Sequence, residues 1–429
     1  MRRSMFVFCA ALIWVQGSLF ADETESGEPC VGPVTIIHSV GVFDGSDVIP
    51  EATVIIQCSL IHRVFEGGEP ADVPPGSRLI DGKGKFLLPG LIDSHTHTFR
   101  REMLERSLDF GVTTVFDMGS LASGFKQTID AEDALGQVTG RADMLGAELW
   151  VTAPGSHGTQ FGDAPTLDKP EGAEEFVAAR VAGGADFIKV IYDNFKMIDR
   201  PIPTLSKEAM QAVVSAAHRH GLKAVFHSRD VDAYTDAVKA GADGFVHVPV
   251  DAVPSEELLS LLKANGVFVS PNLSLARPDG QRLIDDPFIG PMLTDKEISN
   301  LKNFRGMHGK GGDRIAYESV KAFHNAGISI LSGSDTPNGG TTVGASMHIE
   351  MELLVEAGLT PVEAMAAATS APAEVFGLDD RGRIAEGLLA DLLLVEGSPV
   401  QTISNSRNIL TVWKAGEIHS RTGSTEQQD

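Results

Sequence analysis

Two histidines stand two residues apart at the end of a short apolar run, in the stretch LLPGLIDSHTH. If this run is a strand, His95 and His97 project from the same face, because successive side chains of a strand alternate. Two neutral imidazoles on one face can bind a single metal ion. A pair of surface histidines without a ligand would show the same spacing, so this pair alone does not decide the chemistry.

A lysine lies in the middle of another apolar run, ADFIKVIY. Burying an ammonium group is costly unless it is paired or chemically altered. In its neutral form the amine of Lys189 can react with CO2 to give a carbamate, an anion whose two oxygens can bridge two cations. The alternative is an ion pair between Lys189 and an acid inside the fold.

Three more polar residues close apolar runs: His227 in KAVFH, His247 in GFVHV and Asp335 in SILSGSD. A lone strand histidine is usually a hydrogen-bonded core residue, and an Asp after a strand often caps a helix. Together with the pair in LLPGLIDSHTH and a buried lysine, however, these residues indicate metal ligands, with Asp335 also a proton acceptor. The histidines of AAHRHG share the two-residue spacing, but on a predicted helix, where such residues face different directions.

The middle of the chain must position these groups, and it alternates eight apolar runs with helical stretches. That alternation predicts βαβ units and a parallel sheet, with functional groups at the C-terminal strand ends. Both chain ends are instead β-rich and divided by Gly and Pro. We predict an α/β fold, a (β/α)8 TIM-like barrel (85–384) inserted in a small β-sandwich (22–84 and 385–422). A doubly wound open sheet is the alternative.

The N-terminus has the three-part layout of a secretory signal peptide, which we place at residues 1–21. We therefore expect a secreted or periplasmic protein that does not stay in the membrane after cleavage. Removing this segment takes away two arginines and no acid, so the formal charge moves from -23 to -25. Such a charge repels phosphate backbones, and we expect no nucleic-acid partner. Cys30 and Cys58 remain, and a disulfide between them is one of two open outcomes.

The ordered set of these residues resembles the amidohydrolase superfamily over nearly the whole mature chain. PGLIDSHTH resembles the strand-one motif, and RGRIAEGLLADLLLVEGSP, from Arg381, resembles the returning sandwich segment. The resemblance implies two divalent metal ions, with zinc expected, and a carbamate on Lys189 as the bridge. It gives one ion to His95, His97 and Asp335 and the other to His227 and His247. A lysine at this place favours the binuclear branch over the one-metal deaminase-like and imidazolonepropionase-like branches. Within the binuclear branch the chain looks most similar to prolidase-like dipeptidases and acylamino acid hydrolases.

The same resemblance implies a metal-bridging hydroxide that attacks an amide bond of a small substrate, such as a dipeptide or an N-acyl amino acid. Asp335 then acts as the catalytic proton carrier. His157, in TAPGSHGTQFG, and Tyr192 are candidate substrate-binding residues, although His157 could equally be a turn histidine. The alternatives are a lactonase or phosphotriesterase with the same site and a catalytically silent binding barrel. The oligomeric state, a homo-oligomer included, stays open.

Overall fold

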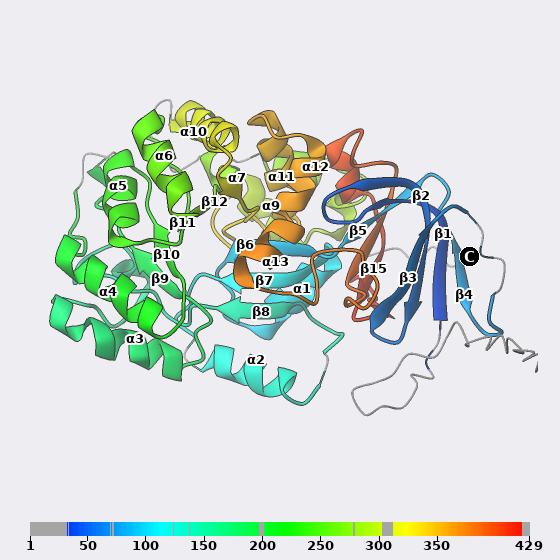
Figure 1. Ribbon diagram of the computed structural model, residues 1–429, viewed down its shortest axis with the longest axis horizontal. Helices are drawn as coiled ribbons and strands as arrows, with labels where there is room; N and C mark the ends of the chain where they lie inside the picture. The colour runs from blue at the N-terminus through cyan, green and yellow to red at the C-terminus, as the bar shows by residue number, and fades with distance from the viewer. Residues whose placement is uncertain are drawn as a thin grey trace, which may run out of the picture.

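The computed structural model describes residues 32, 34–68, 70, 73–122, 124–136, 138–196, 201–277, 279–302 and 312–422. A sheet built from both chain ends lies on one side of the molecule, and a larger body of parallel strands and helices lies beside it (Figure 1). The predicted signal peptide and Cys30 lie outside the described residues. Cys58, whose disulfide with Cys30 the sequence left open, is disulfide-bonded.

The first and last segments of the chain share one mixed sheet with strand order β16-β15-β14-β5-β1-β2-β3, in which β4 pairs with β1. Its strands are β1 (Val34–Phe43), β2 (Val48–Gln57), β3 (Leu60–Glu66), β4 (Arg78–Asp81), β5 (Lys85–Pro89), β14 (Leu392–Glu396), β15 (Ile409–Lys414) and β16 (Glu417–Ile418). Ile37, Val54, Leu392 and Trp413 are fully buried in its own apolar cluster. Both chain ends thus build one β unit, while its sandwich form and the domain bounds stay predictions.

The eight apolar runs of the middle segment form parallel strands. One sheet has the order β6-β7-β8 and the other has the order β13-β12-β11-β10-β9. Their bounds are β6 (Leu91–Thr96), β7 (Val112–Asp117), β8 (Asp143–Gly146), β9 (Ile188–Ile191), β10 (Ala224–His227), β11 (Gly244–Val246), β12 (Phe268–Ser270) and β13 (Ser329–Ile330). The prediction of parallel strands in an α/β fold is confirmed.

Backbone hydrogen bonds continue across both gaps between the two parallel sheets. Beyond β8, the amide of Val151 donates to the carbonyl of Lys189 at 2.7 Å, and the amide of Ile191 donates to Val151 at 2.9 Å. On the other side, the amide of Ser94 in β6 donates to the carbonyl of Ser332, just past β13, at 3.0 Å. The edges of both sheets are therefore paired at these points.

Helices follow most of the parallel strands and lie outside them (Figure 1). They are α1 (Arg101–Asp109), α2 (Phe125–Asp133), α3 (Ala173–Ala182), α4 (Lys207–Arg219), α5 (Val231–Ala240), α6 (Glu256–Ala264), α7 (Leu273–Ala276), α8 (Gln281–Ile284), α9 (Asp295–Lys302), α10 (Gly312–Ala326), α11 (Ser346–Glu356), α12 (Pro361–Ala367) and α13 (Ser370–Phe376). Ser206, Asp230 and Ser255 cap α4, α5 and α6 by accepting backbone N–H groups. The short helices α7, α8 and α9 lie in the stretch after β12.

A separate apolar cluster fills the interior between the parallel strands. It contains residues from each of their segments, among them Ile92, Phe116, Val225 and Phe268. Gly244 is required beside this cluster, because a Cβ there would lie 2.2 Å from the ring of Phe268. These side chains form an apolar layer beneath the polar groups at the C-terminal strand ends.

A buried ion-pair cluster joins the mixed sheet to the parallel strands. The ammonium group of Lys414, in β15, is 2% exposed and donates to Asp391 at 2.7 Å and to Asp143 of β8 at 2.8 Å. Burial lowers the pKa of Lys414, but the two carboxylates outweigh it, so that the pKa is raised above the ordinary value and the amine stays charged. The cluster therefore holds the two parts of the molecule together.

Replacing Lys414 by Met should destabilise the protein, because it leaves two buried carboxylates without this cation. The expected loss in the free energy of unfolding is about 3 kcal/mol, the lower end for breaking a buried pair. Urea denaturation monitored by circular dichroism measures it. Arg314→Met, which removes the exposed pair with Glu318, is the control and should change stability by less than about 1 kcal/mol. Equal effects of both variants would contradict this role of the cluster.

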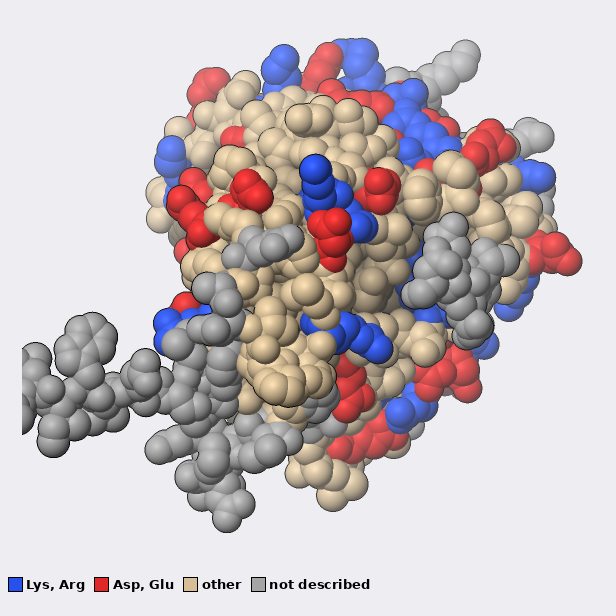
Figure 2. Space-filling view, turned by 90° about the vertical axis from the view of Figure 1, so that its right-hand side faces the viewer, with Lys and Arg blue, Asp and Glu red and all other residues tan. Residues whose placement is uncertain are grey.

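The side of the molecule that the mixed sheet presents carries acidic and basic side chains interspersed with one another (Figure 2). None of the helices in the described part of the chain has the length and apolar character needed to cross a bilayer.

Candidate metal centre

The carboxylate of Asp335 lies at the centre of a group of imidazoles. Its Oδ1 is 3.3 Å from Nε2 of His95 and 3.2 Å from Nε2 of His97, and its Oδ2 is 3.7 Å from Nε2 of His247. One ligand atom from each of His95, His97 and Asp335 lies within 4.8 Å of the others. These three residues can hold one metal ion.

The ends of neighbouring parallel strands position these residues. His95 is in β6, and the chain past β13 runs beside it, where the amide of Asp335 donates to the carbonyl of His95 at 2.7 Å. Gly333 permits this approach, since a Cβ there would lie 2.9 Å from Cβ of His95. Asp335 and His247 both have positive φ, 52° and 66°. Non-glycine residues in this region are strained and often functional.

His227, at the end of β10, extends the cluster. Its ring centroid is 4.4 Å from that of His247 and 4.9 Å from that of His157, and the ring of His247 is 5.2 Å from that of His95. Within the described part of the chain, Nε2 of His227 has no hydrogen-bond partner, although it lies 3.4 Å from Oδ2 of Asp193. The structure thus brings His157 into the same group as the predicted ligands.

Lys189 lies on β9 with its side chain among these groups. It is 2% exposed, and its Nζ has no hydrogen-bond partner among the residues that the structure describes. Burial lowers the pKa of Lys189 to about 7, against the opposing effect of the Asp335 and Asp117 carboxylates. The alternative of a direct ion pair with an acid is not observed among these residues. A large fraction of this amine is therefore neutral at neutral pH.

Burial also keeps most of the imidazoles neutral. It lowers the pKa of His95 and of His227 well below the ordinary value and lowers that of His157 to about 4. At His97 burial is outweighed by the hydrogen bond and the charge of Asp335, so that its pKa is raised. Burial alone would raise the pKa of Asp335, but the neighbouring His95, His97 and Lys189 lower it, and Asp335 is ionised.

Hydrogen bonds at Nδ1 orient the first two histidines. Nδ1 of His95 donates to Oδ1 of Asn272 at 2.8 Å, and Nδ1 of His97 donates to the carbonyl of Gly119 at 2.7 Å. In their neutral forms both rings then present an unprotonated Nε2 to Asp335 and to any metal ion. Asn272 itself is held by its Nδ2, which donates to the carbonyl of Gly333 at 2.8 Å.

Several of these supporting residues were not identified in the sequence. Nδ2 of Asn338 donates to Oδ1 of Asp335 at 2.9 Å, and the buried Glu350 accepts the amides of Leu273 and Ser274 at 2.8 Å each. Glu350 thereby fixes the turn that follows Asn272. No spacing signal marks Asn272 or Glu350, because each acts on a segment distant in the chain. Asn338 lies only three residues past Asp335.

The side chain of Tyr192, a candidate substrate-binding residue, points away from the metal-ligand candidates. Its hydroxyl donates to Asp236 of α5 at 3.2 Å, and its ring packs in the apolar cluster that lies against the helices. Tyr192 is three residues from Lys189, an odd number, so strand alternation directs its side chain to the opposite face. It does not join the metal-ligand cluster.

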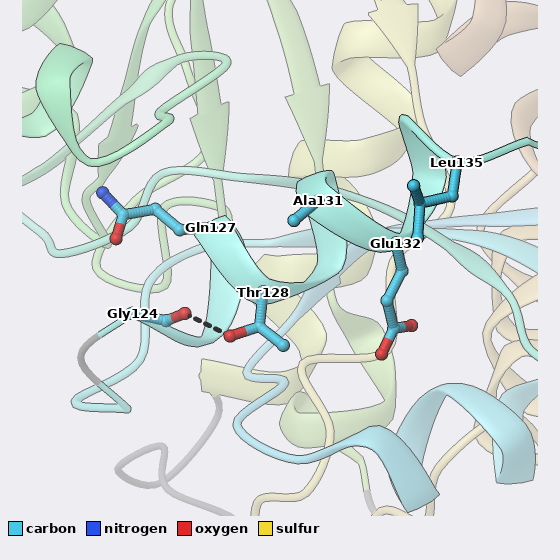
Figure 3. A pocket seen from close by; sticks show the side chains of 6 residues that line it. All are labelled: Gly124, Gln127, Thr128, Ala131, Glu132 and Leu135. Carbon is cyan, nitrogen blue, oxygen red and sulfur yellow. Dashed lines mark hydrogen bonds between the residues drawn. The ribbon is translucent and has the colours of Figure 1, made fainter.

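The two histidines of AAHRHG, His218 and His220, lie at the surface. His218 is hydrogen-bonded to Asp243 and His220 to Glu174 in exposed pairs. A surface hollow along α2, lined by residues such as Gln127, Glu132 and Leu135, contains none of the predicted site residues (Figure 3). Its acid, Glu132, is already paired with Arg101 and Arg141.

Residues 86–419 match the model of the amidohydrolase family. The matched segment spans most of the chain and contains every residue of the candidate centre. The chain belongs to the amidohydrolase family. As the sequence predicted, it is a hydrolase acting on carbon–nitrogen bonds.

This amidohydrolase has relatives of several activities. The imidazolonepropionase of Salinispora arenicola (strain CNS-205) is 23% identical over 377 residues, covering 84% of this chain and 90% of the relative. The dihydroorotase of Endomicrobium trichonymphae is 23% identical over 357 residues, covering 74% and 81%. A Xaa-Pro dipeptidase with methionine bound in its active site has a TM-score of 0.71 at 23% identity, covering 90% of this chain and 99% of that chain. The A. niger ochratoxinase has a TM-score of 0.68 at 20% identity, covering 90% and 95%. The expected likeness to prolidase-like enzymes is confirmed.

Removing the acceptor of His95 should weaken metal binding by this amidohydrolase. We expect Asn272→Ala to lower metal affinity about 10- to 100-fold, because the ring of His95 loses the bond that fixes its tautomer and orientation. Competition with a chromophoric chelator measures the affinity. Asn265→Ala, at the exposed end of α6, is the control and should bind metal like the parent. An unchanged affinity in Asn272→Ala would show that this hydrogen bond does not position His95.

Proposed function

We propose that the chain is a binuclear metal-dependent hydrolase that cleaves an amide bond in a small substrate such as a dipeptide or an N-acyl amino acid. One observation supports it above the others. The amine of Lys189 is buried beside an ionised carboxylate and several imidazoles, yet it has no hydrogen-bond partner in the described chain. A structural lysine would not be left in this state, whereas a carbamate-forming lysine fits it.

The residues present fit two divalent cations, for which we propose zinc. Neutral imidazoles and carboxylates are the ligands that zinc prefers. His95, His97 and Asp335 would hold one cation, and His227 and His247 the other. The carbamate of Lys189 would join the two sites. It forms when the neutral amine attacks CO2 and releases a proton, which changes a neutral group into an anion and supplies two oxygen ligands.

We also propose that the two parallel sheets form one (β/α)8 barrel inserted in the β-sandwich of the chain ends. The hydrogen bonds across both gaps between the sheets support this arrangement, as does the apolar cluster inside the strands. Its C-terminal face would hold the metal centre, the usual place of active sites in such barrels.

The protein's own groups have distinct roles in this proposal. When bound, the cations would lower the pKa of a water molecule towards neutrality and polarise the scissile carbonyl. Asp335 is ionised and accepts the proton of the attacking water, then returns it to the leaving amine. His157, next to His227, would donate a hydrogen bond to the substrate oxygen as negative charge develops on it.

The predicted signal peptide supports a proposal for the cellular location of the enzyme. We propose that the signal peptide directs the enzyme to the periplasm or the exterior, where it acts on small molecules and not on nucleic acids. A lactone or a phosphotriester is the alternative substrate, and a panel of dipeptides, N-acyl amino acids, lactones and phosphotriesters separates these classes.

Metal analysis of the purified protein tests the binuclear centre. We expect about two equivalents of metal in the parent protein and a large loss in Lys189→Ala, because the bridging group is gone. Asp335→Asn should lose metal and activity together. Lys321→Ala, an exposed lysine of α10, is the control and should retain both ions. One equivalent in both the parent and Lys189→Ala would assign the chain to a mononuclear centre.

The pKa of Lys189 gives a pH dependence for metal loading. In metal-free protein this amine is neutral above about pH 7 and protonated below it. Only the neutral form attacks CO2, so CO2-dependent loading should fall about tenfold per unit below pH 7 at constant dissolved CO2. Metal uptake with and without CO2 across pH 5–9 measures it.

The variant Lys189→Glu is the control for the protonation of the histidines. Its side chain is already a carboxylate and needs no CO2. Metal loading of this variant should therefore depend on pH through the histidines but not on CO2. CO2-independent loading of the parent would contradict the carbamate.

A further inference from the structure

His157 lies in the same group of imidazoles as the candidate metal ligands, but it comes from a loop and not from a strand end. The loop joins β8 to α3, and the ring centroid of His157 is 4.9 Å from that of His227. A metal ion binds only an unprotonated ring nitrogen, whereas an oxygen atom of a substrate needs a protonated one. The role of His157 therefore depends on which of its two nitrogens carries the proton.

The side chain of Gln160 determines the position of this proton. The backbone N–H of Gly158 donates to Oε1 of Gln160 at 2.8 Å, and this contact fixes which end of the side-chain amide is the oxygen. The other end, the NH2 group, lies 2.8 Å from Nδ1 of His157. An amide NH2 group can only donate, so Nδ1 must be unprotonated. The ring is then neutral, with its proton on Nε2.

The two histidines assigned to the first cation have the opposite arrangement. Nδ1 of His95 faces an acceptor, Oδ1 of Asn272. Nδ1 of His97 also faces an acceptor, the carbonyl oxygen of Gly119. In the neutral form each of these rings holds its proton on Nδ1 and offers a free Nε2, as metal-ligating histidines do. The donor at Nδ1 of His157 gives the reverse result, a protonated Nε2 that cannot bind a metal ion.

The backbone of the loop holds His157 and Gln160 in this relation. The hydroxyl of Thr152 donates to the carbonyl of His157 at 2.7 Å. Gly158 has a φ of 100°, and a Cβ at this position would lie 2.4 Å from Nε1 of Trp150. Glycine is therefore required there, and the loop packs directly against Trp150. The N–H group that orients Gln160 is thus fixed in place.

The surroundings of the His157 ring also favour a neutral imidazole. Its ring centroid lies 4.8 Å from that of Phe195 and 5.8 Å from that of Phe161, and neither side chain supplies a strong acceptor that would draw a proton to Nδ1. A positively charged ring beside His227 would repel a cation bound there. The neutral ring that Gln160 stabilises is compatible with a bound metal ion.

We propose that Gln160 is a positioning residue that keeps the proton of His157 on Nε2, which excludes this histidine from the metal ligands and makes it a hydrogen-bond donor to the substrate. The inference rests on the proposed function, in which His157 donates to the substrate oxygen, and adds the residue that makes this donation possible. Gln160 acts through the ring of His157. Gln160→Glu, which places a carboxylate acceptor at Nδ1, should therefore reverse the arrangement.

Nitrogen-15 NMR of the histidine rings in the zinc-loaded enzyme tests the position of the proton without catalysis. The couplings between ring nitrogens and carbon-bound ring protons distinguish a protonated Nδ1 from a protonated Nε2, and the signals that are missing from His157→Gln identify this ring. We expect the proton on Nε2 in the parent enzyme and a protonated Nδ1 in Gln160→Glu. A protonated Nδ1 in the parent, or an unchanged pattern in Gln160→Glu, would overturn the proposal.

Metal affinity separates a donor to the substrate from a metal ligand. His157→Gln should bind zinc within about twofold of the parent affinity, because this ring supplies no ligand atom. Competition with a chromophoric chelator measures the affinity. A loss of about tenfold or more would show that His157 is a metal ligand, and the proposal would be wrong.

Kinetics of Gln160→Leu measure what the positioning contributes. We expect this variant to retain its metal and to lose about tenfold in kcat/KM for dipeptides, an effect on the scale of one hydrogen bond. Gln127→Leu is the matched control, since Gln127 is also an exposed glutamine whose Nε2 donates, here to the carbonyl of Ala182 at 3.2 Å. It should keep the kcat/KM of the parent and its NMR pattern for His157. Equal losses in both variants would contradict a specific role of Gln160.

The two kinds of measurement separate this inference from the proposed function. If His157 carries its proton on Nε2 and this depends on Gln160, but no amide is cleaved, the assignment of the proton stands and the proposed function is wrong. If amides are cleaved while Nδ1 of His157 is protonated, the proposed function stands and the role of Gln160 is wrong.

Discussion

The metal centre depends on one constraint: the amine of Lys189 is buried among groups that do not form an ion pair with it. Lys189 is surrounded by imidazoles that burial keeps mostly neutral, and the ionised carboxylate of Asp335 is shared by His95, His97 and His247. A charged ammonium at this place would be costly. Conversion to a carbamate and the binding of cations would remove that cost, so the modification and the metal centre depend on each other.

The rest of the fold keeps this arrangement in place. The apolar layer of Phe116, Val225 and Phe268 excludes water from below. From outside, Asn272 and the carbonyl of Gly119 fix the histidine rings, and Glu350 fixes the turn after Asn272. Lys414 joins the mixed sheet to Asp143, the first residue of β8. Residues far from the centre therefore determine its geometry.

Much of this could be predicted from the sequence, because alternation along a strand is a local rule. It put His95 and His97 on one face of a strand, whereas His227, His247 and Asp335 were found where apolar runs end and Lys189 inside such a run. The structure brings these residues together. The same rule, applied to Tyr192, would have shown that this side chain faces the helices. Asn272 and Glu350 could not be found this way, since their partners lie far along the chain and only the tertiary fold brings them close.

The carbamate is the central claim, and carbon-13 NMR tests it most directly. The protein is loaded with metal in the presence of 13C-labelled bicarbonate and then freed of excess label. The account predicts a carbamate resonance that is present in the loaded parent, absent from Lys189→Ala and lost when the metal is chelated. A fully loaded, active parent protein without this resonance would contradict the account.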